Sequence, residues 1–335
     1  MNIAINGFGR IGRAVFKAVL SKKSAHKIVG INDLTDTATL AHLLAYDSVY
    51  GRFAGKVGYK KDALIVNNRK YPVFAAKDPG ELPWREMEVD VVIESTGFFR
   101  DKDGAGLHLK AGAKKVIISA PAKGNIKTIV MGVNEDKIKK TDRILSNASC
   151  TTNCLAPATD VIRREFGIEK AIMTTIHSYT ADQRIVDGPH KDLRRARAAG
   201  INMVPTTTGA AIAAAETIPA LRGKFDGMSV RVPTPVGSLC DIVFVTRKKT
   251  DEKKINACFK KAARSARLKG ILEVTDAPLV STDIIGNPAS SIIDLGLTKV
   301  VGGNLVKVIA WYDNEWGYSN RMVDLVDYMG RKRLV

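Results

Sequence analysis

Apolar runs rich in valine and isoleucine alternate with helical stretches along the first 150 residues. Runs such as VDVVIES and KKVIIS are continuous, which suits strands that are buried on both faces of a parallel sheet. The pattern predicts strands at 3–6, 28–32, 89–94, 115–119, 129–133 and 144–147, and a helix at 10–22. This alternation is typical of a doubly wound α/β domain.

The second half of the chain has longer apolar runs with loops between them. The pattern predicts strands at 171–177, 228–232, 241–246 and 306–312, and helices from Cys150 toward Arg163, near 209–216, near 252–268 and at 317–330. Such spacing suits an α+β domain that is built on a mostly antiparallel sheet. Residues 178–205 show little periodicity and carry many charges, and a loop of this length is usually functional.

The net charge of +18, from 52 basic and 34 acidic residues in 335, raises the question of a nucleic-acid partner. Residues 1–150 carry 25 basic and 15 acidic side chains, and residues 151–335 carry 27 and 19, so the excess is spread evenly. Aromatic residues make up 6% and do not interleave with the basic clusters as a base-stacking surface requires. We expect solvated faces, with RNA binding left as a secondary role.

Several classes of protein are not expected from this sequence. No apolar run approaches the roughly 18 residues of a membrane-spanning helix. The N-terminus has no charged segment followed by an apolar one, so a cytoplasmic location is expected. The four cysteines form no CxxC pair, and no cysteine–histidine set has zinc spacing, so neither a disulfide framework nor a metal site is predicted.

A glycine motif, Gly7-x-Gly9-x-x-Gly12, follows the first predicted strand and opens the first predicted helix. In this context the glycines allow a tight turn, backbone approach to a pyrophosphate, and close packing of helix on strand. Asp33 ends the second strand, where a carboxylate accepts hydrogen bonds from ribose hydroxyls and repels a 2′-phosphate. The sequence therefore predicts a Rossmann-type domain that binds NAD rather than NADP; a glycine turn in a nucleotide-free domain is the alternative.

Cys150 lies where a predicted strand gives way to a predicted helix, in the block SCTTNC. A helix N-terminus lowers the pKa of a thiol and favours the thiolate. His177 ends the strand 171–177, and a histidine beside such a cysteine forms a thiolate–imidazolium pair that can act as acid and base. Cys154 falls one helical turn further on and is expected to be an inert buried thiol.

Hydroxyls, amides and guanidinium groups gather around the same part of the sequence. Such groups bind phosphate oxygens, although each one alone is more often structural. The candidates are Ser149, Thr151, Thr180, Asp182, Arg195, Thr208, Gly209 and Arg231.

Almost from end to end, the sequence resembles the bacterial-type phosphorylating glyceraldehyde-3-phosphate dehydrogenases. The resemblance rests on INGFGRIGR, NASCTTNC, TTIHSYTADQ, HKDLRRARAA, PTTTGAA, VRVPTP and WYDNEWGYSNR. It implies an NAD-binding domain over 1–149, a catalytic domain over 150–315, and a helix at about 316–335 that packs back on the first domain. It also implies a homotetramer, in which residues 178–201 reach toward the cofactor of a neighbouring subunit.

The resemblance assigns roles to matching residues. Cys150 becomes the nucleophile, and His177 activates it and assists hydride transfer. Beyond the glycines, the implied NAD contacts are Arg10, Ile11, Asp33, Lys77, Ser119 and Asn314. The implied substrate contacts are Ser149, Cys150, Thr151, Thr180, Arg195, Thr208, Gly209 and Arg231.

The implied reaction belongs to glycolysis or gluconeogenesis. It oxidises glyceraldehyde 3-phosphate through a thiohemiacetal and an acyl thioester, and inorganic phosphate then releases 1,3-bisphosphoglycerate. The alternative enzyme is erythrose-4-phosphate dehydrogenase. Around its histidine that enzyme has a sequence similar to TTIHSAMHDQQ, whereas this chain has TTIHSYTADQR. Two departures from the family pattern are Gly188, where many NAD-specific relatives have leucine, and Lys77, where relatives often have arginine. Gly188 leaves room for some NADP use.

Overall fold

A computed structural model describes residues 1–22 and 26–335. The chain divides into two compact units. The first unit contains Met1–Ile129, Glu135–Ala148 and Ser319–Val335, and the second unit contains Val130–Asn134 and Ser149–Tyr318.

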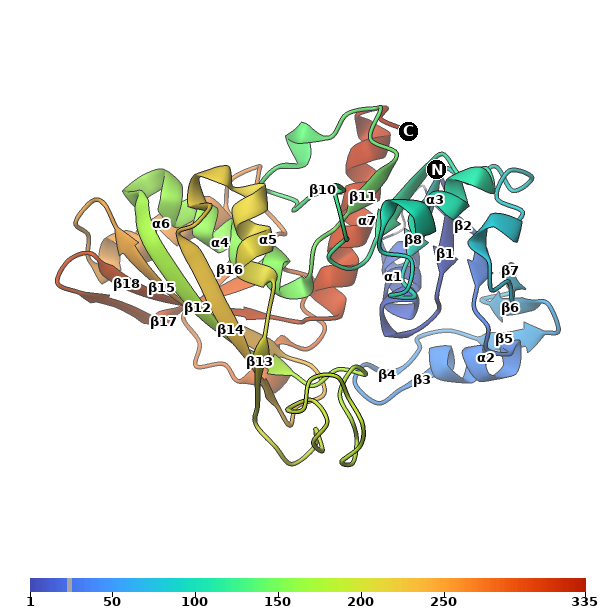
Figure 1. The fold of residues 1–335 in the computed structure, drawn as a ribbon, viewed down its shortest axis with the longest axis horizontal. Coiled ribbons are helices and arrows are strands. Elements are labelled where there is room, and N and C mark those ends of the chain that lie inside the picture. Colours follow the sequence, from blue (N-terminus) through green and yellow to red (C-terminus); the bar gives the residue numbers. More distant parts are fainter. Residues whose placement is uncertain (23–25) are drawn as a thin grey trace. The chain divides into compact units, whose positions relative to one another are not determined.

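A nine-stranded sheet forms the centre of the first unit, in the order β10-β11-β9-β8-β1-β2-β7-β6-β5 (Figure 1). Its strands are β1 (Asn2–Asn6), β2 (Lys27–Asn32), β5 (Val57–Lys60), β6 (Ala63–Val66), β7 (Arg69–Phe74), β8 (Val91–Glu94), β9 (Lys115–Ile118), β10 (Lys127–Thr128) and β11 (Ile144–Ser146). Pairing is parallel from β10 to β7 and antiparallel beyond β7. Every residue of β8 and β9 is buried, as their continuous apolar runs predict.

The helices of the first unit begin where the sequence supplies a suitable cap. They are α1 (Arg10–Ser21), α2 (Thr37–Ala45), α3 (Lys102–Lys110) and the larger part of α7 (Trp316–Arg331). The Asp36 side chain accepts the Thr39 N–H and the Asp101 side chain accepts the Gly104 N–H, which caps α2 and α3. Short elements complete the unit: β3 (Tyr46–Asp47), β4 (Gly51–Arg52), η1 (Pro79–Glu81) and η2 (Glu135–Lys137).

The α7 helix joins the first unit through an apolar face and a polar contact. The face consists of Met322, Leu325, Val326 and Met329, and all four side chains are buried. Lys22, at the end of α1, donates from its Nζ to Asp324 Oδ1 at 2.5 Å. The helical periodicity of the last residues therefore identifies the face that packs inward.

A seven-stranded sheet forms the second unit, in the order β13-β14-β12-β15-β18-β17-β16. Its strands are β12 (Ile168–Ser178), β13 (Val204–Thr207), β14 (Phe225–Val232), β15 (Ser238–Thr246), β16 (Leu272–Thr275), β17 (Ser291–Val301) and β18 (Leu305–Tyr312). Only the β12–β14 and β16–β17 pairs are parallel, so the predicted mostly antiparallel sheet is confirmed.

The helices of the second unit gather on one face of this sheet (Figure 1). They are α4 (Cys150–Phe166), α5 (Ala210–Thr217) and α6 (Glu252–Ala263), and two short turns, η3 (Pro219–Leu221) and η4 (Ser281–Ile284), connect other segments. Burial alternates strictly along β15, because one face of the strand meets these helices. No helix in the described part of the chain is long and apolar enough to cross a bilayer.

The predicted strand at 129–133 is wrong. Residues 131–134 form a turn, in which the Val130 N–H donates to Asn134 Oδ1 at 2.8 Å and Gly132 adopts a φ of +82°. The apolar residues of this run are buried without belonging to a strand, which periodicity cannot distinguish. The helix predicted at 252–268 ends earlier, at Ala263, and the antiparallel strands β5 to β7 are not predicted by the strand–helix alternation.

Candidate active site

The turn between β1 and α1 has the geometry that the glycine motif predicts. Gly7 has a φ of +89°, and a Cβ there would lie 2.7 Å from Thr96 N. A Cβ at Gly12 would lie 2.0 Å from Gly7 O, whereas a Cβ at Gly9 would meet nothing within 4 Å. Two of the glycines are therefore required by packing, and the third leaves open space at the start of the helix.

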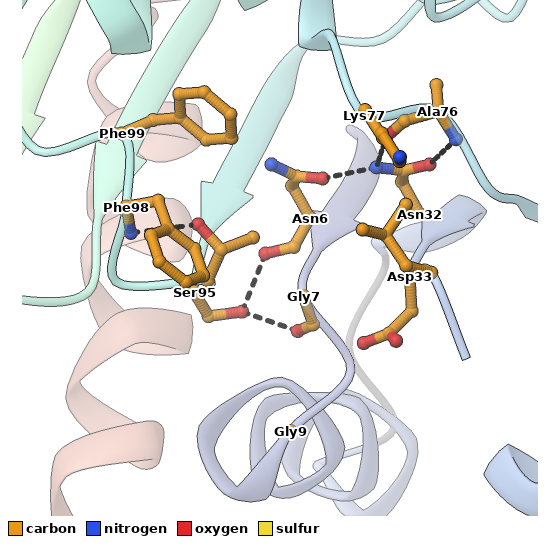
Figure 2. Close-up of a pocket in the computed structure, with 12 residues that line it drawn as sticks. Asn6, Gly7, Gly9, Asn32, Asp33, Ala76, Lys77, Ser95, Phe98 and Phe99 are labelled. Carbon is orange, nitrogen blue, oxygen red and sulfur yellow. Dashed lines mark hydrogen bonds between the residues drawn. The ribbon is translucent and has the colours of Figure 1, made fainter. Parts of the chain in front are cut away.

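A cavity of about 540 Å³ opens at the carboxyl ends of β1, β2 and β8 (Figure 2). Its lining is Asn6, Gly7, Gly9, Asn32, Asp33, Leu34, Ala76, Lys77, Ser95, Thr96, Phe98 and Phe99. In the sheet, β1 lies between β2 and β8. The connection from β1 to β2 therefore leads toward one edge of the sheet, and the strands that follow β8 extend toward the other edge. Ligands of open α/β sheets bind at such a switch point.

The Asp33 carboxylate is held in place by the backbone. Asp33 Oδ2 accepts the Phe8 N–H at 2.7 Å, and Oδ1 accepts the Thr35 N–H at 2.9 Å. Each oxygen keeps a second lone pair that can accept a ribose hydroxyl. Gly9, the N-cap of α1, supplies no side-chain cap, so the first turn can bind an anion through its backbone. These residues fit an adenine dinucleotide.

The other predicted cofactor residues of the first unit differ in their contacts and in their position relative to the cavity. Arg10 donates from its Nη1 to Asp47 Oδ1 at 2.9 Å and lies over the Tyr50 ring. Burial is the largest single influence on Asp47 and opposes its ionisation, but the Arg10 hydrogen bond, the Val49 and Tyr50 N–H groups and the Arg10 charge together lower the pKa of Asp47 to about 2. The Arg10 guanidinium is therefore committed to the protein. Ile11 follows it in the same turn, and Ser119 follows β9 outside the cavity lining.

The structure brings the predicted cysteine and histidine together in the second unit. Cys150 is the first residue of α4, and the preceding Ser149 caps this helix by accepting the Thr152 N–H at 3.0 Å. His177 lies near the end of β12, and its Nε2 is 3.4 Å from Cys150 Sγ. This distance allows a proton to pass between sulfur and imidazole.

The tautomer of His177 follows from its second contact. His177 Nδ1 lies 2.7 Å from Ser178 O, and a carbonyl oxygen can only accept. Nδ1 therefore carries the hydrogen, and Nε2 presents a lone pair to Cys150. The imidazole also packs edge-on against the Tyr312 ring, with centroids 5.9 Å apart.

Burial favours the neutral forms of Cys150 and His177, in opposition to the helix N-terminus that favours a thiolate. Burial raises the pKa of the Cys150 thiol, although the charge of Arg231 acts in the opposite direction. Burial, with Arg231 as the second cause, lowers the pKa of His177 to about 3. Desolvation is the largest cause of both pKa shifts.

Arg231 connects the cysteine–histidine pair to the predicted phosphate residues. It lies on β14 directly beside His177 in the parallel register. Its Nη1 donates to Ser178 O at 3.2 Å and to Thr180 Oγ1 at 3.1 Å. The same backbone carbonyl therefore orients both His177 and Arg231.

Arg195 is held by two carboxylates, and this corrects the expectation for Asp182. Arg195 Nε donates to Thr206 Oγ1 at 2.9 Å and lies 3.5 Å from Asp192. Its Nη1 forms an ion pair with Asp182. Burial opposes this charge, but Arg195 lowers the pKa of Asp182, so the carboxylate stays ionised and would repel a phosphate. Asp182 is therefore a partner of Arg195, not a phosphate ligand.

The remaining predicted substrate residues lie at two neighbouring helix starts. Thr208 Oγ1 accepts the Ala210 N–H at 3.2 Å, and Gly209 is the N-cap of α5. Thr152 Oγ1 donates to Ala210 O at 3.5 Å, which links the first turns of α4 and α5. Thr151 Oγ1 contacts Tyr312 Oη at 2.9 Å, so this hydroxyl is turned toward the protein interior. Two helix N-termini side by side favour an anion.

Asn314 has a fixed amide orientation. Its Oδ1 accepts the Gly237 N–H at 3.2 Å and the Ser238 hydroxyl at 2.9 Å. Ser238 Oγ in turn accepts the Ser178 N–H at 3.1 Å, so one hydroxyl connects Asn314 to the strand end that carries His177. The Asn314 Nδ2 group is left as a donor for another partner.

Three residues of this site were not predicted from the sequence: Ser178, Ser238 and Tyr312. Tyr312 is buried and places its hydroxyl 2.9 Å from both Thr151 Oγ1 and Thr175 Oγ1. A tyrosine inside an apolar strand needs a polar partner for its hydroxyl, so its position in the sequence could have indicated that Tyr312 contacts polar residues. Across the described residues, no group of three or more histidine, cysteine or acidic side chains could hold a metal.

A nucleotide-binding sheet and a cysteine–histidine pair with two nearby arginines define the class of the protein. This class is the dinucleotide-dependent dehydrogenases. The comparison with known proteins then identifies the family.

Two family models cover most of the chain. The NAD binding domain of glyceraldehyde 3-phosphate dehydrogenase matches residues 1–102, and its C-terminal domain matches residues 149–314. The glyceraldehyde-3-phosphate dehydrogenase of Streptomyces coelicolor is 52% identical over 333 residues, which is 99% of each chain. That of Geobacillus stearothermophilus is 54% identical over 335 residues, covering 100% of this chain and 99% of the relative. The chain belongs to the glyceraldehyde-3-phosphate dehydrogenase family, which confirms the predicted family and its NAD cofactor.

Proposed function

We propose that this protein oxidises glyceraldehyde 3-phosphate with NAD and inorganic phosphate to give 1,3-bisphosphoglycerate, as in glycolysis and gluconeogenesis. The observation that carries the proposal is the 3.4 Å contact between Cys150 Sγ and His177 Nε2, with Nδ1 fixed by Ser178 O. A thiol beside a correctly oriented imidazole base suits an aldehyde that must be held covalently during oxidation.

The first half of the reaction forms a thioester on Cys150. The sulfur attacks the aldehyde carbon, and the thiol proton passes through His177 Nε2 to the carbonyl oxygen, giving a thiohemiacetal. His177 then takes the hydroxyl proton as the C–H bond is broken and the C=O bond reforms. The bound NAD supplies the hydride acceptor for this step.

The second half releases the product and restores the pair. An oxygen of inorganic phosphate attacks the thioester carbon, and the Cys150 sulfur leaves as the acyl phosphate forms. The proton held on His177 returns to the sulfur. Because the thioester retains the energy of aldehyde oxidation, it can be transferred to phosphate rather than lost to water.

We assign the anionic groups of the reactants to Arg231 and Arg195, with contacts from Thr180, Thr208, Gly209, Ser149 and Thr151. Asp182 and Asp192 hold Arg195 before the ligand arrives, which reduces the entropy lost on binding. The Asn314 Nδ2 group is assigned to the nicotinamide carboxamide, and Gly7, Gly9, Arg10, Ile11, Gly12, Asp33, Lys77 and Ser119 to the remainder of NAD.

We also propose a cytoplasmic homotetramer, with a nucleotide domain over 1–149 and about 316–335 and a catalytic domain over 150–315. All four cysteines are free thiols in the described structure, which suits a reducing compartment. Large apolar side chains are exposed in the segment 178–201, which supports contacts with other subunits: Ile185, Val186, Leu193 and Ile201.

The reaction is tested by following reduced nicotinamide absorbance with NAD or NADP, with and without phosphate. We expect turnover with NAD to require phosphate or arsenate, and NADP to be used at least about 10-fold less efficiently because Asp33 repels its 2′-phosphate. Turnover that ignores phosphate would contradict the phosphorylating reaction. Equal rates with both cofactors would contradict the role of Asp33.

Arg231→Ala is expected to lower kcat/KM for the aldehyde by about 100-fold or more, because a charged hydrogen-bond donor to phosphate is lost. NAD affinity, measured by calorimetry, should stay unchanged. Arg222→Ala provides the matched control, since Arg222 is an exposed arginine of the same unit. An Arg231 variant with a normal KM for the aldehyde would rule out this arginine as a phosphate ligand.

A further inference from the structure

Beneath the dinucleotide cavity, five polar side chains form one hydrogen-bonded chain in the first unit. They come from five different segments and are all buried: Asn32, Asn6, Glu94, His108 and Trp84. Asn32 and Asn6 line the cavity, as Figure 2 shows, whereas Glu94, His108 and Trp84 are not among its lining residues. The proposed reaction gives the last three no role.

The direction of the chain is fixed at its first end by a backbone group. The Ala76 N–H can only donate, and it lies 2.9 Å from Asn32 Oδ1. Asn32 Nδ2 therefore faces Asn6 and donates to its Oδ1 at 2.7 Å. This orients Asn6 Nδ2 toward Glu94 Oε2, at 2.5 Å.

The other end of the chain is fixed by an indole. Trp84 Nε1–H can only donate, and it lies 3.0 Å from His108 Nδ1. His108 Nδ1 is therefore the acceptor, and Nε2 carries the hydrogen that it donates to Glu94 Oε2 at 3.0 Å. Both ends of the chain thus deliver a hydrogen to the same carboxylate oxygen.

The second oxygen of Glu94 shapes another wall of the cavity. Oε1 accepts the Thr96 N–H at 2.8 Å and the Thr96 hydroxyl at 2.5 Å. Thr96 Oγ1 accepts the Phe98 N–H at 3.1 Å, which closes the turn after β8. All four groups around Glu94 donate, so both of its oxygens act as acceptors.

We propose that Glu94, held by His108 and Trp84, is a positioning residue for the dinucleotide. It fixes the amide of Asn6 on one wall of the cavity and the Thr96–Phe98 turn on the other. The inference rests on the proposed function only in that the cavity binds NAD. It states that Glu94 acts on cofactor affinity through these neighbours, without touching the cofactor.

Replacement of Glu94 by glutamine isolates this role, because the shape is kept while one acceptor becomes a donor. In Glu94→Gln, an NH₂ group must face either Asn6 Nδ2 and His108 Nε2–H or the two donors of Thr96. We expect the dissociation constant for NAD to rise about 10- to 100-fold, because a buried polar group loses its partner. The KM for NAD should rise in parallel. At saturating NAD, kcat and the KM for the aldehyde should stay within about twofold, because the second unit is unchanged.

Val92→Ala is the matched control, since Val92 is a buried core residue of the same strand that takes no part in the chain. The melting temperature of each variant is measured beside its NAD affinity. If Glu94→Gln weakens NAD no more than Val92→Ala does at a similar loss of melting temperature, the inference is overturned. A wild-type protein that binds no NAD would instead contradict the proposed function.

A second pair of variants keeps the test decisive if Glu94→Gln does not fold. His108→Gln retains a donor that can reach Glu94, and we expect its NAD affinity to stay within about threefold of wild type. His108→Leu removes this donor and should reproduce the 10- to 100-fold loss. Equal NAD affinities in these two variants would overturn the inference.

Discussion

Cys150→Ser is expected to lower kcat for aldehyde oxidation by about 10⁴-fold or more while leaving NAD affinity unchanged. A serine hydroxyl holds its proton far more tightly than a thiol does, and His177, with a pKa of about 3, is a weak base in the resting protein. The imidazole can accept the proton of a thiol as sulfur attacks, but it is poorly matched to a hydroxyl.

Cys258→Ser is the control for this variant, because Cys258 is a half-buried free thiol on α6. Reduced nicotinamide formation and NAD binding by calorimetry are measured for both variants. The control should keep wild-type turnover. A Cys150 variant that retained more than about a tenth of the wild-type rate would show that the nucleophile lies elsewhere.

His177→Asn is expected to lower kcat by about 10²- to 10⁴-fold, because general acid–base catalysis is lost. Asparagine can keep the donor to Ser178 O, which His177 Nδ1 provides at 2.7 Å, but it has no group in place of Nε2. Alkylation of Cys150 by iodoacetamide should also slow in this variant, since no base accepts the thiol proton. An unchanged alkylation rate would rule out proton transfer between the two residues.

The pH dependence of alkylation distinguishes a neutral pair from an ion pair. Because burial raises the pKa of Cys150 and lowers that of His177 to about 3, the wild-type rate should climb with pH through the neutral range. A thiolate–imidazolium pair would instead give a plateau from acidic to neutral pH. The lowered pKa of His177 also makes the folded protein less stable below about pH 6.5, where the unfolded chain binds an extra proton.

Much of the fold could be predicted where local pattern and tertiary environment agree. The apolar runs of β8 and β9 are buried on both faces, and the face of α7 that carries Met322 and Leu325 is the one that packs inward. The prediction failed at 129–133, where the same kind of run is buried in a turn that a side chain of Asn134 closes. Periodicity reports burial, and it cannot report which hydrogen bonds accompany it.

The sequence allowed the candidate reactive groups of the site to be named, but not the residues that hold those groups in position. For Cys150, His177 and the motif glycines, the residue type together with its local sequence context indicates the candidate role. Tyr312 and Ser238 act through long-range contacts, which only the antiparallel register of β12, β15 and β18 creates. Asp182 was grouped with the candidate phosphate residues, whereas the structure pairs its carboxylate with Arg195, a tertiary contact that the sequence does not reveal.

The hydrogen-bonded chain behind the cavity has a consequence for the chemical ageing of the protein. Asn6 precedes Gly7, and asparagine–glycine sequences deamidate when the glycine nitrogen attacks the side-chain carbonyl. Here the Gly7 N–H donates to Asn32 O at 2.8 Å, and Asn6 Oδ1 accepts from Asn32 Nδ2. Both reacting groups are therefore held in other bonds. These contacts therefore hinder deamidation of this peptide, and an aspartate formed there would place a second carboxylate against that of Glu94.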